Sequence, residues 1–228
     1  MNEIHDTLAS VPYFKHLGAK AIALLASKTN PRKVETRGII LLQDEPCAGL
    51  GIVITGEVRV LRTSSEGREQ VLRILGPGRS FNDVAAIDGG PNPATVVATT
   101  ATSVASISHQ ALMHLLDDRP DVAKAMLSLI ARRQRFLVEM IEDAALHSVV
   151  GRVARLLLRC ASGDQPLIEG AADACQRVTQ QDIAAVAGSV RAVVPPAMKY
   201  LEPAGAIRLG RAGLLIVDAA LISTYSYR

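Results

Sequence analysis

Apolar positions along the chain change their spacing twice, and each change marks a different kind of structure. In residues 1–30, Ile4, Leu8 and Val11 recur at helical spacing, and so do Ile22, Leu24 and Leu25. A repeat of three or four residues is typical of helices with one buried face. We therefore predict short amphipathic helices at the N-terminal end.

From Val34 the pattern becomes short apolar runs separated by Gly, Pro and Asp. The runs are RGIILL, LGIVITGEVRVLRT, QVLRIL and PATVVATTATSVASIS. Residues alternate between apolar and polar in EVRVLR, and SSEGR follows it as a hairpin turn. Many short strands at this spacing predict a small all-β barrel or roll.

Residues 120–145 predict one long helix, because no Gly or Pro follows Pro120 in this segment. An apolar stripe of Leu127, Ile130, Leu137, Ile141 and Ala144 runs along it. The stripe could pack on the β-roll or pair with a second copy. We favour dimerisation, because such a helix has more apolar surface than one small roll can cover. The charged positions predicted to be exposed are Arg132, Arg133, Arg135, Glu139, Glu142 and Asp143.

After His147 the pattern predicts a helix, VVGRVARLLLRCA, then a polar loop and a compact helical motif. Thr179 and Asp182 form a capping-box-like start, Ala184 is small where two helices would cross, and Gly188 suits a tight turn. The later segment AIRLGRAGLLIVD predicts two short strands around Gly210–Gly213. Together these features indicate a winged helix-turn-helix.

Composition narrows the class of protein. The 228 residues are 49% hydrophobic and 21% charged, which is typical of globular proteins, and a net charge of +3 alone does not argue for nucleic acid. Basic residues outnumber acidic ones after Gly151, which agrees with a DNA-binding role for that part. The absence of a signal peptide, of a membrane-length apolar run and of paired cysteines predicts a cytoplasmic protein with reduced thiols and no metal site.

In this order the segments resemble the cyclic-AMP receptor / fumarate-nitrate regulator (Crp/Fnr) family. The match rests on GIVITGEVRVLRTSSEGREQVLRILGPGRSF, VVGRVARLLL, QQDIAAVAGSVRAVV and KYLEPAGAIRL. It implies an α+β fold with a cyclic-nucleotide-binding-like β-roll (1–118), a long dimerisation helix (119–146) and a winged helix-turn-helix domain (147–228). It also implies a homodimeric transcription regulator, with double-stranded DNA, RNA polymerase and a small-molecule effector as candidate partners and no membrane.

The effector site of the family is altered here. Its Gly-Glu-Leu turn corresponds to Asn82-Asp83-Val84, and its phosphate-binding Arg-Ser pair corresponds to Asn92-Pro93. A cyclic phosphate would thus meet a carboxylate and no cation, so we expect an effector other than cyclic AMP or cyclic GMP. The alternative is a pocket filled by its own side chains. The candidate effector residues are Phe81, Asn82, Asp83, Asn92, Thr95, Leu137 and Val138.

No cofactor can be assigned from the residues. The N-terminal cysteine cluster of the iron–sulfur members is missing, and nothing pairs the surface histidines His16, His109 and His114 for haem. Cys47 could be a redox sensor, but its loop has no basic neighbour to favour the thiolate.

The segment SVRAVVPPAMKYLE takes the place of the recognition helix. Ser189 would cap it and Arg191 could read guanine, but Pro195 and Pro196 replace a second family pair of base readers. An interior proline costs a helix about 3 kcal/mol, so we predict a kinked or shortened helix that starts regularly at Pro195. The candidate DNA-binding residues are Arg177, Thr179, Gln180, Ser189, Arg191, Lys199, Arg208 and Arg211.

Two functions follow from this pattern. The first is a DNA-binding transcription regulator. The second is a ligand- or partner-binding sensor module whose DNA-reading helix has decayed at the prolines. No catalytic triad, carboxylate pair, metal motif or phosphate loop is recognisable, so we predict no enzymatic activity.

Overall fold

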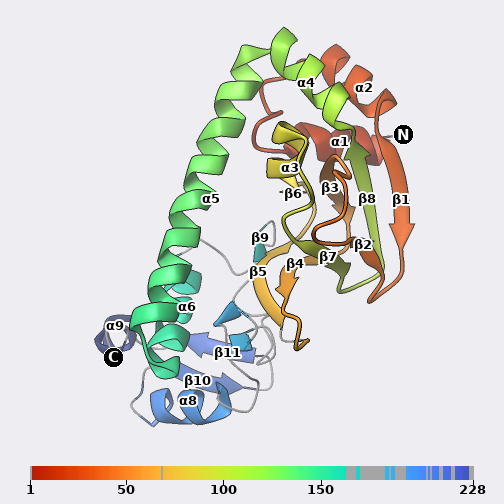
Figure 1. Ribbon diagram of the computed structural model, residues 1–228. Coiled ribbons are helices and arrows are strands. Elements are labelled where there is room, and N and C mark those ends of the chain that lie inside the picture. Colours follow the sequence, from red (N-terminus) through yellow and green to blue (C-terminus); the bar gives the residue numbers. More distant parts are fainter. Residues whose placement is uncertain are drawn as a thin grey trace. The chain divides into compact units, whose positions relative to one another are not determined.

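The computed structural model describes residues 2–67, 69–162, 168–169, 183–184, 186–187, 194–203, 205, 207–210, 213–216 and 219–225. The chain forms two compact units (Figure 1). We call Met1–Glu66 with Ile74–Arg133 the roll unit, and Gly67–Arg73 with Gln134–Arg228 the C-terminal unit. The predicted domain limits 1–118, 119–146 and 147–228 stay predictions.

The roll unit contains two small sheets. Their strands are β1 (Asn30–Val34), β2 (Ile39–Leu41), β3 (Leu50–Thr55), β4 (Val58–Thr63), β6 (Ser80–Phe81), β7 (Thr95–Ala98) and β8 (Thr102–Ile107). One sheet has the order β1-β8-β3-β6, and β2, β7 and β4 are neighbours in the other. The predicted β-roll is confirmed. The sequence pattern missed β1, whose Pro31 is tolerated because β1 is an edge strand.

Helices gather at one end of the roll (Figure 1). They are α1 (Asn2–Ser10), α2 (Ala19–Ser27), α3 (Asp83–Asp88) and α4 (His109–Asp118), followed by α5 (Pro120–Leu146). The two predicted N-terminal helices and the long helix are confirmed. Ser108 caps α4 by accepting a hydrogen bond from the Ala111 N–H at 3.2 Å.

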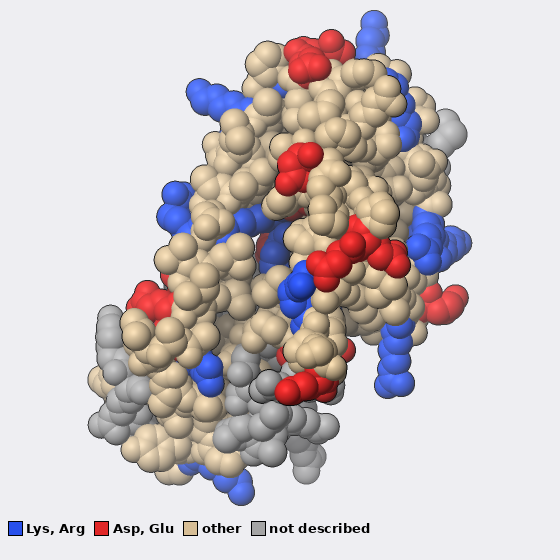
Figure 2. Space-filling view, in the orientation of Figure 1, with Lys and Arg blue, Asp and Glu red and all other residues tan. Residues whose placement is uncertain are grey.

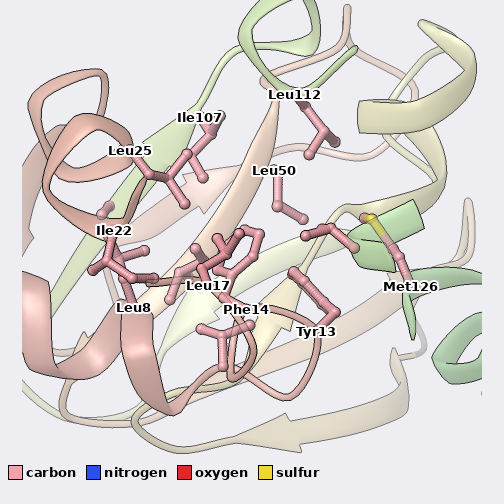
Figure 3. Close-up of a cluster of buried hydrophobic side chains, with 14 of the residues drawn as sticks. Leu8, Tyr13, Phe14, Leu17, Ile22, Leu25, Leu50, Ile107, Leu112 and Met126 are labelled. Carbon is pink, nitrogen blue, oxygen red and sulfur yellow. The ribbon is translucent and has the colours of Figure 1, made fainter. Parts of the chain in front are cut away.

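The core of the roll unit lies between these helices and the β1-β8-β3-β6 sheet. Figure 3 shows Leu8, Phe14, Ile22, Leu50 and Ile107 pointing toward one another, and each is almost fully buried. Tyr13 and Phe14 meet edge to face, with ring centroids 4.6 Å apart. The start of α5 joins this core through Val122 and Met126. Tyr13 and Phe14 thus contribute to the packing of this core.

The C-terminal unit holds the second half of α5 and the elements that follow it. These are α6 (Val149–Ser162), β9 (Ile168–Glu169), α8 (Val194–Leu201), β10 (Ile207–Gly210), β11 (Gly213–Ile216) and α9 (Ala219–Tyr225), and β9 pairs with β5 (Glu69–Leu75). α6 packs against α8 and α9. Ile207 pairs with Ile216 and Gly210 with Gly213, so the predicted β-hairpin wing is confirmed.

Candidate effector and DNA-binding sites

Two buried amides organise the loop between β6 and β7, where the effector was expected. Asn82 adopts a left-handed backbone conformation with φ 63° at the start of α3. Its Nδ2 donates to the Gly49 carbonyl oxygen and to Asn92 Oδ1, both at 2.9 Å. Asn92 Nδ2 donates to the Leu42 carbonyl oxygen at 3.0 Å. The amides therefore bind neighbouring backbone and each other.

Asp83, the next residue, forms a buried ion pair. Ser80 Oγ donates to Asp83 Oδ1 at 2.7 Å, and the guanidinium of Arg133 on α5 binds Asp83 Oδ2. Arg133 Nη2 also donates to the Ser80 carbonyl oxygen at 3.3 Å. Asp83 is 6% exposed. Removing one partner of a salt bridge this deeply buried strongly destabilises the folded protein.

This pair corrects two predictions from the sequence. Arg133 was expected on the exposed face of the helix, but its side chain is only 17% exposed. The loop was also expected to lack a cation, but Arg133, which lies 50 positions after Asp83 in the sequence, supplies one. Both predictions were wrong because sequence spacing identifies the exposed face of a helix only when the partner of each face is known.

The remaining expected effector residues serve other contacts. Phe81 is buried over Gly51, where an added Cβ would lie 2.0 Å from the Phe81 ring. Thr95 is buried and its Oγ1 accepts a hydrogen bond from the Gln43 N–H at 3.1 Å. Leu137 and Val138 belong to the C-terminal unit and are 39% and 55% exposed. The structure brings the roll residues together, and their polar side chains bind other protein groups.

Cys47 and His109, which were considered as a redox sensor and a haem ligand, lie within hydrogen-bonding distance of neighbouring backbone carbonyl groups. The Cys47 S–H donates to the Ala85 carbonyl oxygen at 3.1 Å. His109 Nδ1 lies 2.8 Å from the Ala86 carbonyl oxygen, whereas His16 and His114 are exposed. Among the described residues no group of His, Cys, Asp and Glu side chains could hold a metal ion.

The apolar stripe of α5 is divided between two environments. Ile130 is half-buried and packs against the roll core. Leu127 and Ile141 are 65% and 67% exposed, and Leu137 and Ala144 are also exposed. A single chain therefore leaves a row of large apolar side chains in solvent.

A cluster of charges joins α5 to α6 in the C-terminal unit. Asp143 is 9% exposed, which contradicts the prediction that it lies on the exposed face. Its Oδ1 lies 2.5 Å from Arg155 Nε, and Arg159 binds Oδ2. Glu139, also predicted to be exposed, is half-buried with its carboxylate 3.6 Å from Arg159. The prediction failed for Asp143 because Arg155 and Arg159 of α6 pair with its carboxylate.

The same unit contains a cavity of about 330 Å³. Most of its lining is apolar, with three arginine or aspartate side chains and one glutamine. Its lining residues are Gln70, Leu72, Phe136, Leu137, Met140, Ile141, Asp143, Ala144, Arg152, Leu156, Arg159, Val186 and Ala187. Sequence reasoning did not single out this cavity. The helical spacing of Arg152, Leu156 and Arg159 was the only available signal, and it does not reveal a space.

The described part of the recognition segment is short. α8 spans Val194–Leu201, with Pro195 and Pro196 in its first turn, where the missing N–H groups cost least. Ala197, Met198 and Leu201 are buried, and Lys199 is exposed. Ser189–Val193 lies outside the described residues, so the predicted distortion before the prolines stays a prediction.

Most candidate DNA contacts fall in parts of the chain that are not described. Arg177, Thr179, Gln180, Ser189, Arg191 and Arg211 lie outside the described residues. Arg208 belongs to strand β10 of the wing. Ala184, expected where two helices cross, is 3% exposed. Figure 2 shows Lys and Arg interspersed with Asp and Glu over the described residues of one face, rather than gathered in one basic patch.

Comparisons with known proteins agree with this architecture. A model of the cyclic nucleotide-binding domain matches residues 31–119, and one of the Crp-like helix-turn-helix domain matches residues 151–223. A CRP-like cAMP-activated global transcriptional regulator of Mycobacterium tuberculosis is 31% identical over 94% of this chain and 96% of its own. The chain belongs to the Crp/Fnr family of transcription regulators.

Solved structures share the fold of this Crp/Fnr regulator. The catabolite activator protein of Thermus thermophilus is 26% identical, with a TM-score of 0.54 over 95% of this chain and 98% of that one. FixK2 of Bradyrhizobium japonicum is 20% identical, with a TM-score of 0.71 over 86% of this chain and 96% of that one. Within the described residues, no helix has both the length and the apolar character needed to cross a membrane.

Proposed function

We propose that this Crp/Fnr regulator is a homodimer that pairs along α5. The observation that carries this proposal is the exposed apolar row of Leu127, Leu137 and Ile141. Large apolar side chains repeated along a helix are stabilised when a second helix covers them. A two-fold dimer would present two DNA-binding units, matched to half-sites about one helical turn of DNA apart.

Within each copy, we assign DNA contacts to the recognition segment and the wing. Arg191 would contact bases, and Lys199 is exposed on α8 as a further candidate contact. Arg177, Arg208 and Arg211 would bind phosphates, with Thr179, Gln180 and Ser189 at the ends of the two helices. Because phosphate contacts dominate this set, affinity should fall steeply with salt and specificity should depend on DNA shape.

We also propose that the effector of this regulator is not a cyclic nucleotide. The Mycobacterium tuberculosis relative is cAMP-activated. Here Arg133, the cation at the effector loop, is already paired with Asp83 and Ser80. A phosphate would have to displace a buried carboxylate that is already paired with this guanidinium, which is unfavourable.

The remaining expectations follow from family membership. A transcription regulator acts on DNA and on RNA polymerase, so we place the protein in the cytoplasm. We assign it no catalytic activity, because its Mycobacterium tuberculosis relative is a transcriptional regulator.

A mobility-shift assay tests the DNA-binding role. The full-length protein should shift a duplex from its own upstream region, and Arg191→Ala combined with Arg211→Ala should weaken the shift at least tenfold. Lys33→Ala, on the exposed strand β1 of the roll, is the matched control and should leave binding unchanged. A complete lack of shift at low salt, on this duplex and on random duplex, would support the sensor module with a decayed reader.

A further inference from the structure

The cavity of the C-terminal unit has an apolar wall built from two helices and a strand. On α5, Phe136 and Met140 are four residues apart and lie on one face. Leu156 projects from α6, and Leu72 lines the cavity from β5. A volume of about 330 Å³ lies at the small end of the range for ligand pockets.

One charged group in this wall lacks a counter-ion. Arg152 lies one helical turn before Leu156 on α6 and lines the same cavity. Its Nε is buried and has no hydrogen-bond partner, and no described carboxylate pairs with its guanidinium. The Arg152 side chain is half-buried, and a partly desolvated guanidinium without a counter-ion favours an anionic partner.

The neighbouring carboxylate cannot fill that role. Asp143 also lines the cavity, but Arg155 and Arg159 already bind its two oxygens. Arg159 in turn lies over the Phe136 ring at 5.7 Å. Arg159 also lies 3.6 Å from the Glu139 carboxylate, so Arg152 is the cavity-lining cation that no described carboxylate neutralises.

We propose that this cavity binds a monocarboxylic acid with an apolar body. The carboxylate would form paired hydrogen bonds with the Arg152 guanidinium, and the apolar body would cover Phe136, Met140 and Leu156. A single carboxylate would pair with Arg152, the cavity-lining cation without a described counter-ion, whereas inorganic phosphate has no apolar body to cover the apolar wall. The site contains no residue of the effector loop in the roll unit.

A ligand in this cavity would contact the DNA-binding motif itself. Val186 and Ala187 line the cavity, and Gln70 Nε2 donates to the Val186 carbonyl oxygen at 3.2 Å. Occupancy would therefore bias the position of the first helix of the DNA-binding motif. Leu137 and Ile141 of the proposed dimer face also line this cavity, so both the binding of the acid and this regulatory consequence rest on the proposed function.

Calorimetry on the full-length protein, without DNA, tests the proposal with sodium octanoate as the probe. We expect saturable binding of one octanoate per chain, at least tenfold tighter than 1-octanol, and no competition by inorganic phosphate. Arg152→Gln should weaken octanoate binding at least tenfold. Arg135→Gln, an exposed arginine of α5 that does not line the cavity, is the matched control and should bind as the natural protein does.

A second variant keeps the test decisive if Arg152→Gln folds poorly. Leu72→Phe narrows the cavity and retains Arg152, so it should also lose octanoate binding. Equal binding of octanoate and octanol, competition by phosphate, or unchanged binding by Arg152→Gln or by Leu72→Phe would overturn the proposal. Octanoate binding by a protein that never shifts DNA would overturn the proposed DNA-binding role and leave this site standing.

Discussion

The effector loop of the roll unit and the cavity of the C-terminal unit use an arginine in opposite ways. In the roll, Arg133 is paired with the buried carboxylate of Asp83 and with Ser80. In the cavity, Arg152 faces apolar side chains and has no described anion. Arg133 stabilises the fold of its unit, whereas Arg152, without a described counter-ion, is free to pair with the carboxylate of the proposed ligand.

Arg133→Met should give the largest effect, because it leaves the buried Asp83 carboxylate without its cation. We expect a loss of about 3–5 kcal/mol in the free energy of unfolding of the roll unit, measured by urea denaturation. Arg132→Met, on the exposed neighbour, should change it by less than about 0.5 kcal/mol. Similar losses in both variants would show that Arg133 is not a structural partner.

Ile141→Glu should weaken the proposed dimer, because it places a charge in the exposed apolar row of α5. We expect the free energy of association to fall by about 2–4 kcal/mol, measured by analytical ultracentrifugation over a range of concentrations. Leu146→Glu introduces the same charge at a position that is 74% exposed and outside the stripe. That control should remain as dimeric as the natural protein.

Arg152→Met tests most directly whether Arg152 and Arg133 differ in their contribution to stability. Because Arg152 has no described anion, we expect the free energy of unfolding to change by less than about 1 kcal/mol, or to rise. The measurement is the same urea titration that is used for Arg133→Met. A loss near that of Arg133→Met would mean that Arg152 has a structural partner, and that the two sites are alike.

Arg119→Gln should give the smallest effect. The Arg119 side chain hydrogen-bonds Asp121 and lowers the pKa of its carboxyl group below the ordinary value. This exposed pair stabilises the fold above the ordinary carboxyl pKa, and the contribution is lost as pH falls through the lowered pKa. In Arg119→Gln the pKa of Asp121 should rise toward its ordinary value, as an NMR titration of the carboxyl carbon would show.

Much of the fold followed from local patterns. The strand runs of the roll, the long helix and the wing were predicted because apolar spacing and turn residues act over a few positions. β1 was missed because Pro31 and the charged Arg32 and Lys33 do not look like a strand. Pairing with β8 decides its conformation, and that partner is distant in the sequence.

The candidate sites were less predictable. The sequence placed Asp83 at the effector loop but could not identify Arg133 as its partner, because no local pattern connects residues 50 positions apart. Asp143 was expected on the exposed face of its helix, and the two arginines of α6 bury it. The helical spacing of Arg152, Leu156 and Arg159 did not reveal the cavity, since a cavity depends on how several elements fail to fill a space.

The sequence by itself determined the class of protein: the order of roll, long helix and winged motif, and the proline pair in the recognition segment. Tertiary structure alone decided which arginine neutralises Asp83, which charged side chains of α5 are buried, and where a cavity remains. The physical reason is that helices, strands and turns depend on neighbours in the sequence. Charge pairing and cavities depend instead on side chains that only the fold brings together.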